Sequence, residues 1–129
     1  MLVTRLFLGF SALVWLPYGV FCAVQPSFLA GAAGVVASSP TALTEIRAMY
    51  GGLEAGIGAL CLCALFRPAL ARPALLMLCF VCGGLGLTRL GGMFLDGSGS
   101  AYTFGALGLE IPSAVMASVL VSRLHPGEP

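Results

Sequence analysis

The sequence predicts an all-α transmembrane protein, an antiparallel four-helix bundle with both termini in the cytoplasm. Three observations lead to this prediction: the hydrophobic content, four apolar stretches of membrane-spanning length, and the distribution of arginine. Of 129 residues, 59% are hydrophobic and only 9% are charged, whereas a soluble domain carries about 25% charged residues. Because such a chain cannot cover itself with a solvated surface, we expect the lipid bilayer to be its solvent. Residues 1–129 are predicted to form a single integral membrane domain.

Four mainly apolar stretches meet the length of about 20 residues that a membrane-spanning helix needs. They cover approximately residues 2–24, 43–66, 73–95 and 102–121. Backbone polar groups in hydrocarbon must be satisfied within their own segment, so each stretch is expected to be a helix. Short connections between consecutive helices favour antiparallel neighbours.

The first stretch has Arg5 before a long apolar run, a pattern that secretory signal peptides share. The run is long for such a peptide and Pro17 interrupts it, so we favour a spanning helix. In the following connection, residues 27–37 are too short to span but apolar enough to lie in the interface or to dip inward. Ser39 and Pro40 are a suitable start for the second helix, because serine caps free amides and proline fits the first turn.

Arginine indicates the orientation. The helix ends that share one side of a four-span chain are flanked by Arg5, Arg67, Arg72 and Arg123. On the other side, the charges of Glu45, Arg47 and Asp96 nearly balance. The positive-inside rule therefore places both termini in the cytoplasm. The use of arginine without lysine, with abundant alanine and glycine, suggests a GC-rich bacterial genome and hence the bacterial inner membrane.

Glycine marks turns and helix contacts in this pattern. Gly97 is suited to a left-handed helix end at the turn between the third and fourth stretches. Gly52 and Gly56 follow the small-x-x-x-small spacing that lets helices approach closely in lipid. His125 belongs to a tail that we expect to be frayed and solvated.

Three ionisable residues, Glu54, Arg89 and Glu110, each lie inside a different predicted span. A charged group at the bilayer centre costs about 2.5 to 3.5 kcal/mol on translocon scales, so these groups must be paired or hydrated. Helical periodicity puts each of them on the polar or small-residue face of its span. One guanidinium has enough donors to bridge two carboxylates. The sequence therefore predicts an internal polar site built from the three residues.

Arg47, Tyr50 and Asp96 lie nearer the outer helix ends and are predicted to form the mouth of this site. If the three inner groups are all ionised, they carry a net charge of −1. Either one glutamate then holds a proton or a cation occupies the site. The alternative is a buried ion-pair network that only fixes helix register.

Cysteine offers the other reactive groups. Cys79 and Cys82 have C-x-x-C spacing in the third stretch and are the candidates for metal or redox chemistry. Cysteine is also a small apolar residue that fits helix interfaces, and the predicted spans contain no histidine. We therefore favour packing, and the sequence predicts no metal site and no cofactor.

Two blocks of residues carry a resemblance to a known family. They are E-I-R-A-M-Y-G-G-L-E at residues 45–54 and T-R-L-G-G-M-F-L-D-G at residues 88–97, followed by a glutamate in the last span. They resemble the family catalogued as domain of unknown function 4345, whose members are similar in length and four-span layout. The recognisable positions of that family pattern are Arg47, Tyr50, Gly51, Gly52, Arg89, Gly92, Asp96 and Gly97. The resemblance implies this architecture and no established activity, and it implies that glutamine or another polar residue is common at the position of Glu54.

Three functional hypotheses follow. The first is binding or permeation of a small solute or ion, with a homo-oligomer expected because a bundle of 129 residues is small for a transporter. The second is an accessory or assembly subunit whose buried charges only specify packing. The third is an intramembrane enzyme that uses the polar site or Cys79 and Cys82, although the sequence predicts no catalytic residues. The net charge of +1 and the lack of a basic patch argue against a nucleic-acid partner.

Overall fold

The computed structural model describes residues 1–124, and all regular structure in that range is helical. The elements are α1 (Leu2–Val24), α2 (Phe28–Ala33), α3 (Pro40–Ile46), η1 (Arg47–Leu53), α4 (Glu54–Phe66), η2 (Pro68–Leu70), α5 (Ala71–Asp96) and α6 (Ala101–Arg123). Four continuous helical stretches are long and apolar enough to cross a membrane: Leu2–Val24, Pro40–Phe66, Pro68–Asp96 and Ala101–Arg123. The all-α class and the four membrane-length helices are therefore confirmed. His125, for which a solvated tail was predicted, lies outside the described residues.

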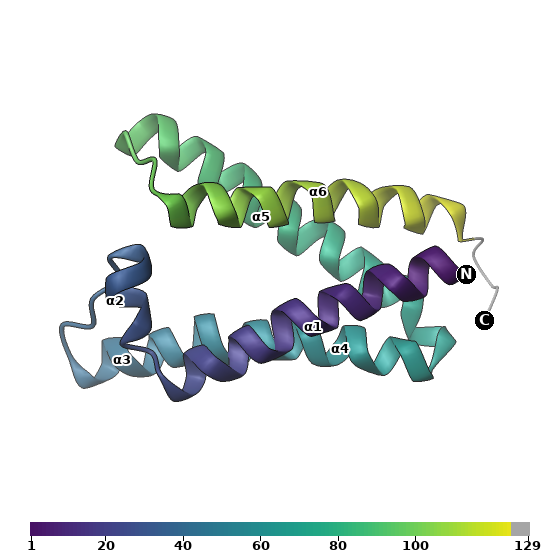
Figure 1. Cartoon of the computed structure of the whole chain (residues 1–129), viewed down its shortest axis with the longest axis horizontal. Coiled ribbons are helices and arrows are strands. Elements are labelled where there is room, and N and C mark those ends of the chain that lie inside the picture. Colours follow the sequence, from purple (N-terminus) through teal and green to yellow (C-terminus); the bar gives the residue numbers. More distant parts are fainter. Residues whose placement is uncertain (125–129) are drawn as a thin grey trace. The chain divides into compact units, whose positions relative to one another are not determined.

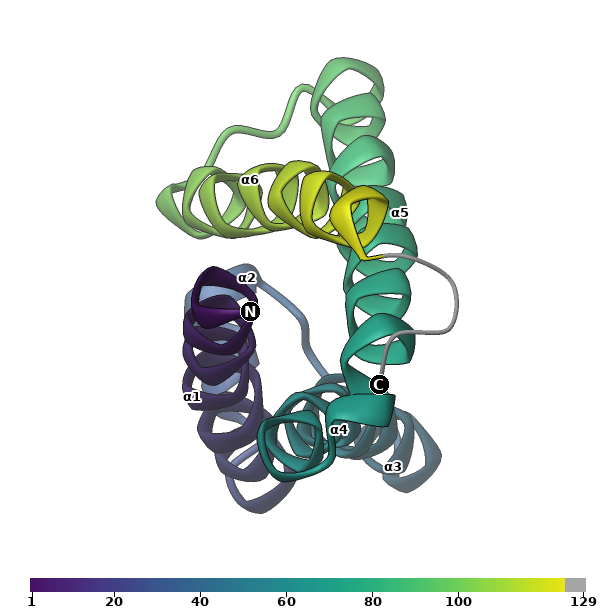
Figure 2. The same ribbon diagram turned by 90° about the vertical axis from the view of Figure 1, so that its right-hand side faces the viewer.

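The chain divides into two compact units, Met1–Ala71 and Arg72–Pro129. In the first unit, α1 and α4 lie side by side (Figure 1 and Figure 2). Arg5 near the start of α1 donates to the carbonyl of Leu65 near the end of α4. At the opposite end of the pair, Arg47 donates to the carbonyl of Ala23. The two helices are therefore antiparallel.

Glycine permits the close approach of α1 and α4. A β-carbon added at Gly19 would overlap the backbone of Ala55, and one added at Gly58 would overlap the backbone of Leu16. Gly52 and Gly56, the pair with small-x-x-x-small spacing, have open space where a β-carbon would stand. The close contact instead involves Gly51 and Ala55, the neighbouring pair in this helix with the same small-x-x-x-small spacing.

The segment before α4 is a π-helix of seven residues, η1. In an uninterrupted α-helix, residues seven apart share a face, but a π-helical turn contains an extra residue. Here Arg47, Gly51 and Ala55 follow one another along the side that meets α1. Glu54 is the first residue of α4 and is half-buried beside this line of contact.

A short helix and a loop close one end of the first unit. α2 buries Leu29 completely and ends at Gly34, whose φ is 71°. The Phe28 ring meets the Phe21 ring of α1 edge to face, with centroids 5.1 Å apart. The next helix begins as predicted, since the Ser39 hydroxyl accepts a hydrogen bond from the Ala42 amide at 3.1 Å.

The second unit is another antiparallel helix pair, α5 with α6 (Figure 1). Cys79 meets Ser118 in the first half of α5 and the second half of α6. Arg89 meets Glu110 nearer the connection between the helices. That connection turns at Gly97, whose φ of 61° confirms the predicted left-handed helix end.

Candidate polar site

The centre of the candidate site is an ion pair between Arg89 of α5 and Glu110 of α6. The guanidinium binds side-on: Nε donates to Oε2 at 3.0 Å and Nη2 donates to Oε1 at 2.7 Å. Both carboxylate oxygens therefore receive a donor from the same planar group, which is the strongest common geometry for such a pair. The structure thus confirms that two of the three predicted charged residues meet.

The pair differs in burial between its partners. Glu110 is 3% exposed, whereas the Arg89 side chain keeps 26% of its surface accessible. The Arg89 guanidinium carbon also lies 6.0 Å from the centroid of the Tyr102 ring, within the range of a cation–π interaction. The carboxylate is therefore enclosed by protein, and the cation provides the more accessible side of the pair.

Close packing on the neighbouring turns allows this contact. Gly86 lies one turn before Arg89, and a β-carbon there would overlap the side chain of Ile111. Ile111 in turn is next to Glu110 on α6. The glycine therefore leaves room for the end of the Ile111 side chain beside the ion pair.

Glu54 belongs to the first unit, where it lies near two polar side chains of α1. Cys22 is completely buried, and it interacts with the Tyr18 side chain and with the charge of Glu54. Tyr18 and Cys22 are four residues apart on α1, so they share one face of that helix. The convergence of Glu54 with Arg89 and Glu110 stays a prediction.

The residues predicted for the mouth of the site have different surroundings. Arg47 is exposed and donates to the carbonyls of Ala23 and of Val24, the latter at 3.4 Å. Tyr50 is half-buried on η1, and Asp96 is exposed at the end of α5. Their role as a mouth stays a prediction, whereas the contact of Arg47 with the end of α1 is a structural role that the sequence did not indicate.

Two further arginines bind a helix end in the same way. Arg72 at the start of α5 donates to Val121 O at 3.3 Å and to Leu124 O at 3.0 Å, at the end of α6. Arg5 donates to Leu65 O at 3.4 Å, at the end of α4. The last carbonyls of a helix have no intrahelical partner and carry partial negative charge, so a cation there is favourable. In each long antiparallel pair, an arginine of one helix thus donates hydrogen bonds to the C-terminal end of the other helix.

The cysteines take part in packing contacts. Cys79 Sγ lies 2.9 Å from Ser118 Oγ across α5 and α6, and Cys82 is completely buried. Within residues 1–124, no group of three or more histidine, cysteine, aspartate or glutamate side chains could hold a metal ion. The contact of Cys79 with a hydroxyl was not predicted, because it depends on the register of two helices.

Four helices of this length and hydropathy define the class of multi-pass membrane proteins. The family model described as a domain of unknown function (DUF4345) matches residues 3–121. The chain belongs to this family, as its two sequence blocks suggested. No curated protein and no solved structure matches the chain.

Proposed function

We propose that this chain is a multi-pass protein of the bacterial inner membrane and that its four long helices form one antiparallel bundle. The four apolar helices support a membrane location. The placement of Arg5, Arg67, Arg72 and Arg123 supports an orientation with both termini in the cytoplasm. The lipid bilayer is then the protein's immediate surroundings, and a homo-oligomer is the proposed assembly.

Within that bundle, we propose a polar site that binds or passes a small solute or ion. The observation that carries the proposal is the buried carboxylate of Glu110, held by Arg89 through two hydrogen bonds. A helix whose only role is to span the bilayer would not carry such groups, because each ionisable residue costs about 2.5 to 3.5 kcal/mol at the bilayer centre.

The proposed ligand is a cation, a proton included. Arg89 and Glu110 neutralise each other, and Glu54 adds a negative charge inside another apolar helix. A single excess negative charge in a low-dielectric region is unfavourable, so it favours a bound cation or a held proton. Arg47, Tyr50 and Asp96 are proposed to line the approach to this site.

Ion-dependent stability tests the proposal. We expect the thermal unfolding temperature of the purified protein in lipid nanodiscs to rise with sodium or potassium chloride relative to choline chloride, or to depend on pH in the range where a carboxyl titrates. Glu54→Gln should remove that response, because it deletes the excess charge. Glu45→Gln, an exposed glutamate on α3, is the matched control and should keep it.

A second candidate is an accessory or assembly subunit whose charges specify packing. The complete pairing of both Glu110 oxygens favours it, since a satisfied ion pair needs no further ligand. A wild-type protein that responds to none of these cations and to no change of pH would support this second candidate and overturn the ion site.

A further inference from the structure

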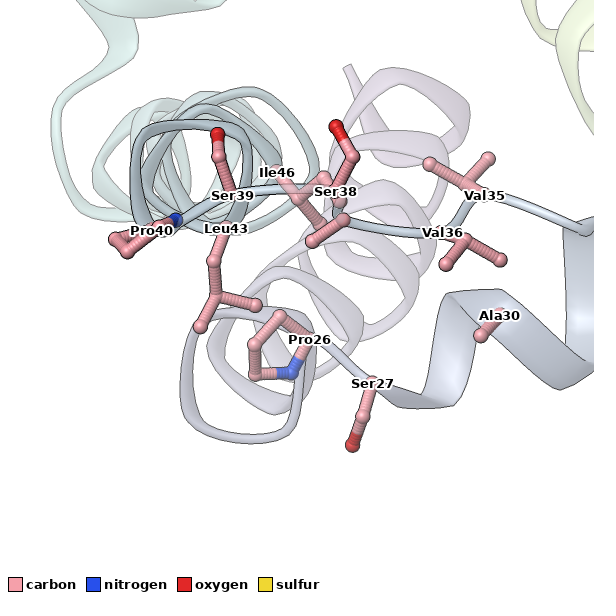
Figure 3. A pocket seen from close by; sticks show the side chains of 11 residues that line it. Pro26, Ser27, Ala30, Val35, Val36, Ser38, Ser39, Pro40, Leu43 and Ile46 are labelled. Carbon is pink, nitrogen blue, oxygen red and sulfur yellow. The ribbon is translucent and has the colours of Figure 1, made fainter.

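The first unit contains a pocket that no part of the polar site explains. It lies at the end of the unit, between the residues after α1, the short helix α2 and the start of α3 (Figure 3). Its volume is about 540 Å³, within the range of about 300 to 1,000 Å³ that is typical of sites for small organic ligands. Pro26, Ala30, Val36 and Leu43 are among the residues that line it.

The lining of this pocket is apolar and carries no charge. Of its 11 residues, eight are apolar and three are serines. In the close-up, the hydroxyls of Ser27, Ser38 and Ser39 point away from the middle of the group, and the Leu43 and Val36 side chains point towards it (Figure 3). The Ser39 hydroxyl already accepts a hydrogen bond from the Ala42 amide. A charged ligand would therefore find no side chain of opposite charge among the residues that line the pocket.

The position of the pocket indicates what can fill it. It is formed by residues that follow Leu2–Val24 and by the first residues of Pro40–Phe66, and both of these helices are long enough to cross a membrane. The ends of membrane-spanning helices lie where the hydrocarbon of a bilayer meets its polar layer. The apolar groups present at that level in quantity are the acyl chains of lipids.

We propose that this pocket, the loop-end pocket, binds the hydrocarbon chain of a membrane lipid. Water would gain few hydrogen bonds there, since an ordered water needs two to four polar partners. An empty pocket would leave its walls without dispersion contacts on one side. An acyl chain would supply these dispersion contacts to the pocket walls, and it needs neither a charged partner nor a hydrogen-bond donor. This site shares no residue with the polar site, so the two proposals stand or fall separately.

Photo-crosslinking with a labelled lipid tests the assignment. The full chain is reconstituted into vesicles of phosphatidylethanolamine and phosphatidylglycerol that contain a phospholipid with a diazirine in one acyl chain. We expect labelling of the pocket residues in the 26–46 segment to exceed labelling at Phe80, a side chain of α5 that is 75% exposed. Equal labelling at the two places would overturn the proposal, because it would show ordinary contact with bulk lipid.

A filled pocket provides the matched comparison. Ala30→Phe places a ring in the loop-end pocket, and we expect it to lower labelling there by about tenfold, the change that about 1.4 kcal/mol of lost binding free energy produces. Gly31→Phe adds the same ring on the next residue, where a β-carbon meets nothing within 4 Å, and should leave labelling unchanged.

A second filling variant guards against a folding defect. If Ala30→Phe fails to accumulate, Val36→Phe fills the pocket from the loop instead, and the same loss of labelling is expected. Undiminished labelling in a folded filling variant would contradict the proposal. A photoreactive amino acid placed at Ala30 that crosslinks to another copy of the chain would also overturn the proposal, because it would show that a protein segment occupies the pocket.

Discussion

At the scale of single residues, Arg89 and Glu110 show how a charged pair is tolerated in an apolar hairpin. Each carboxylate oxygen has its own donor, and the partner ring of Tyr102 contacts the guanidinium region. A buried ion pair often contributes little net stability relative to apolar residues of similar volume. Removing only one partner is much more costly, because it leaves an uncompensated charge.

This asymmetry predicts the outcome of a paired substitution. Arg89→Met should lower the free energy of unfolding by about 3 to 5 kcal/mol, since it leaves the Glu110 carboxylate enclosed and unpaired. Adding Glu110→Met to the same chain should recover most of the loss. Reversible unfolding in mixed detergent micelles measures both values. A double variant no more stable than Arg89→Met alone would contradict this account, and Arg123→Gln, at an exposed position, is the control.

The sequence predicted this pair but not all of its surroundings. Depth and helical phase placed Arg89 and Glu110 within reach, because both properties can be counted along the chain. Tyr102 was not predicted, although it lies eight residues before Glu110 on the same helix. Its contact depends on how α5 and α6 cross, and side-chain spacing alone does not contain the crossing geometry.

At the scale of elements, the second spanning stretch contains the π-helix η1 and meets α1 through a line of small residues. Hydropathy identified the helix correctly, since Pro40–Phe66 is continuous and apolar. It did not indicate a change in hydrogen-bond register between Arg47 and Leu53. Beyond that segment, Gly58 rather than Gly56 meets the backbone of α1. The small residues on that face, Gly51, Ala55 and Gly58, are four and three residues apart, the spacing that shares one face of an α-helix.

Alanine substitutions at Gly58 and at Gly56 distinguish the glycine that contacts α1 from the glycine that faces open space. Gly58→Ala should destabilise the protein by about 1 to 3 kcal/mol, because its β-carbon would overlap the backbone of Leu16. Gly56→Ala has open space and should stabilise it by up to about 1 kcal/mol, the helix propensity difference between the two residues. Thermal unfolding in the same lipid compares the two variants directly. Equal effects would mean that the close approach of α1 and α4 is not maintained.

At the scale of the whole molecule, the chain consists of two compact units, each built on one antiparallel pair of long helices. The number, type and approximate ends of these helices could be predicted, because membrane-spanning length is directly visible in the sequence. The pair of α5 and α6 is joined by a short connection, which sufficed to predict it, whereas the connection from α1 to α3 is long and contains α2. The small helix α2 and the pocket beside it were beyond such prediction, since they depend on how a mostly apolar loop folds back.

The proposed orientation leads to a prediction for the complete chain. A green fluorescent protein fused after the last residue should fluoresce, because that end is proposed to lie in the cytoplasm. Alkaline phosphatase inserted in the turn at Gly99 should be active, because that turn is proposed to lie on the opposite side. The reciprocal fusions are the controls and should be inactive. Active phosphatase at the C-terminus would contradict the orientation.

The arginine contacts at helix ends have a consequence for any attempt to re-engineer the topology. Arg5 and Arg72 belong to the set that we propose to direct insertion, and each also donates to the backbone at the end of a neighbouring helix. Replacing both arginines in order to invert the protein would also remove these hydrogen bonds, which hold together helix pairs that the inverted protein still needs. Lysine would preserve the insertion signal but would lack the planar fork of donors. Under the proposed orientation, the direction of insertion and the cohesion of the hairpins therefore depend on the same two residues, and only a substitution that keeps the positive charge would separate them.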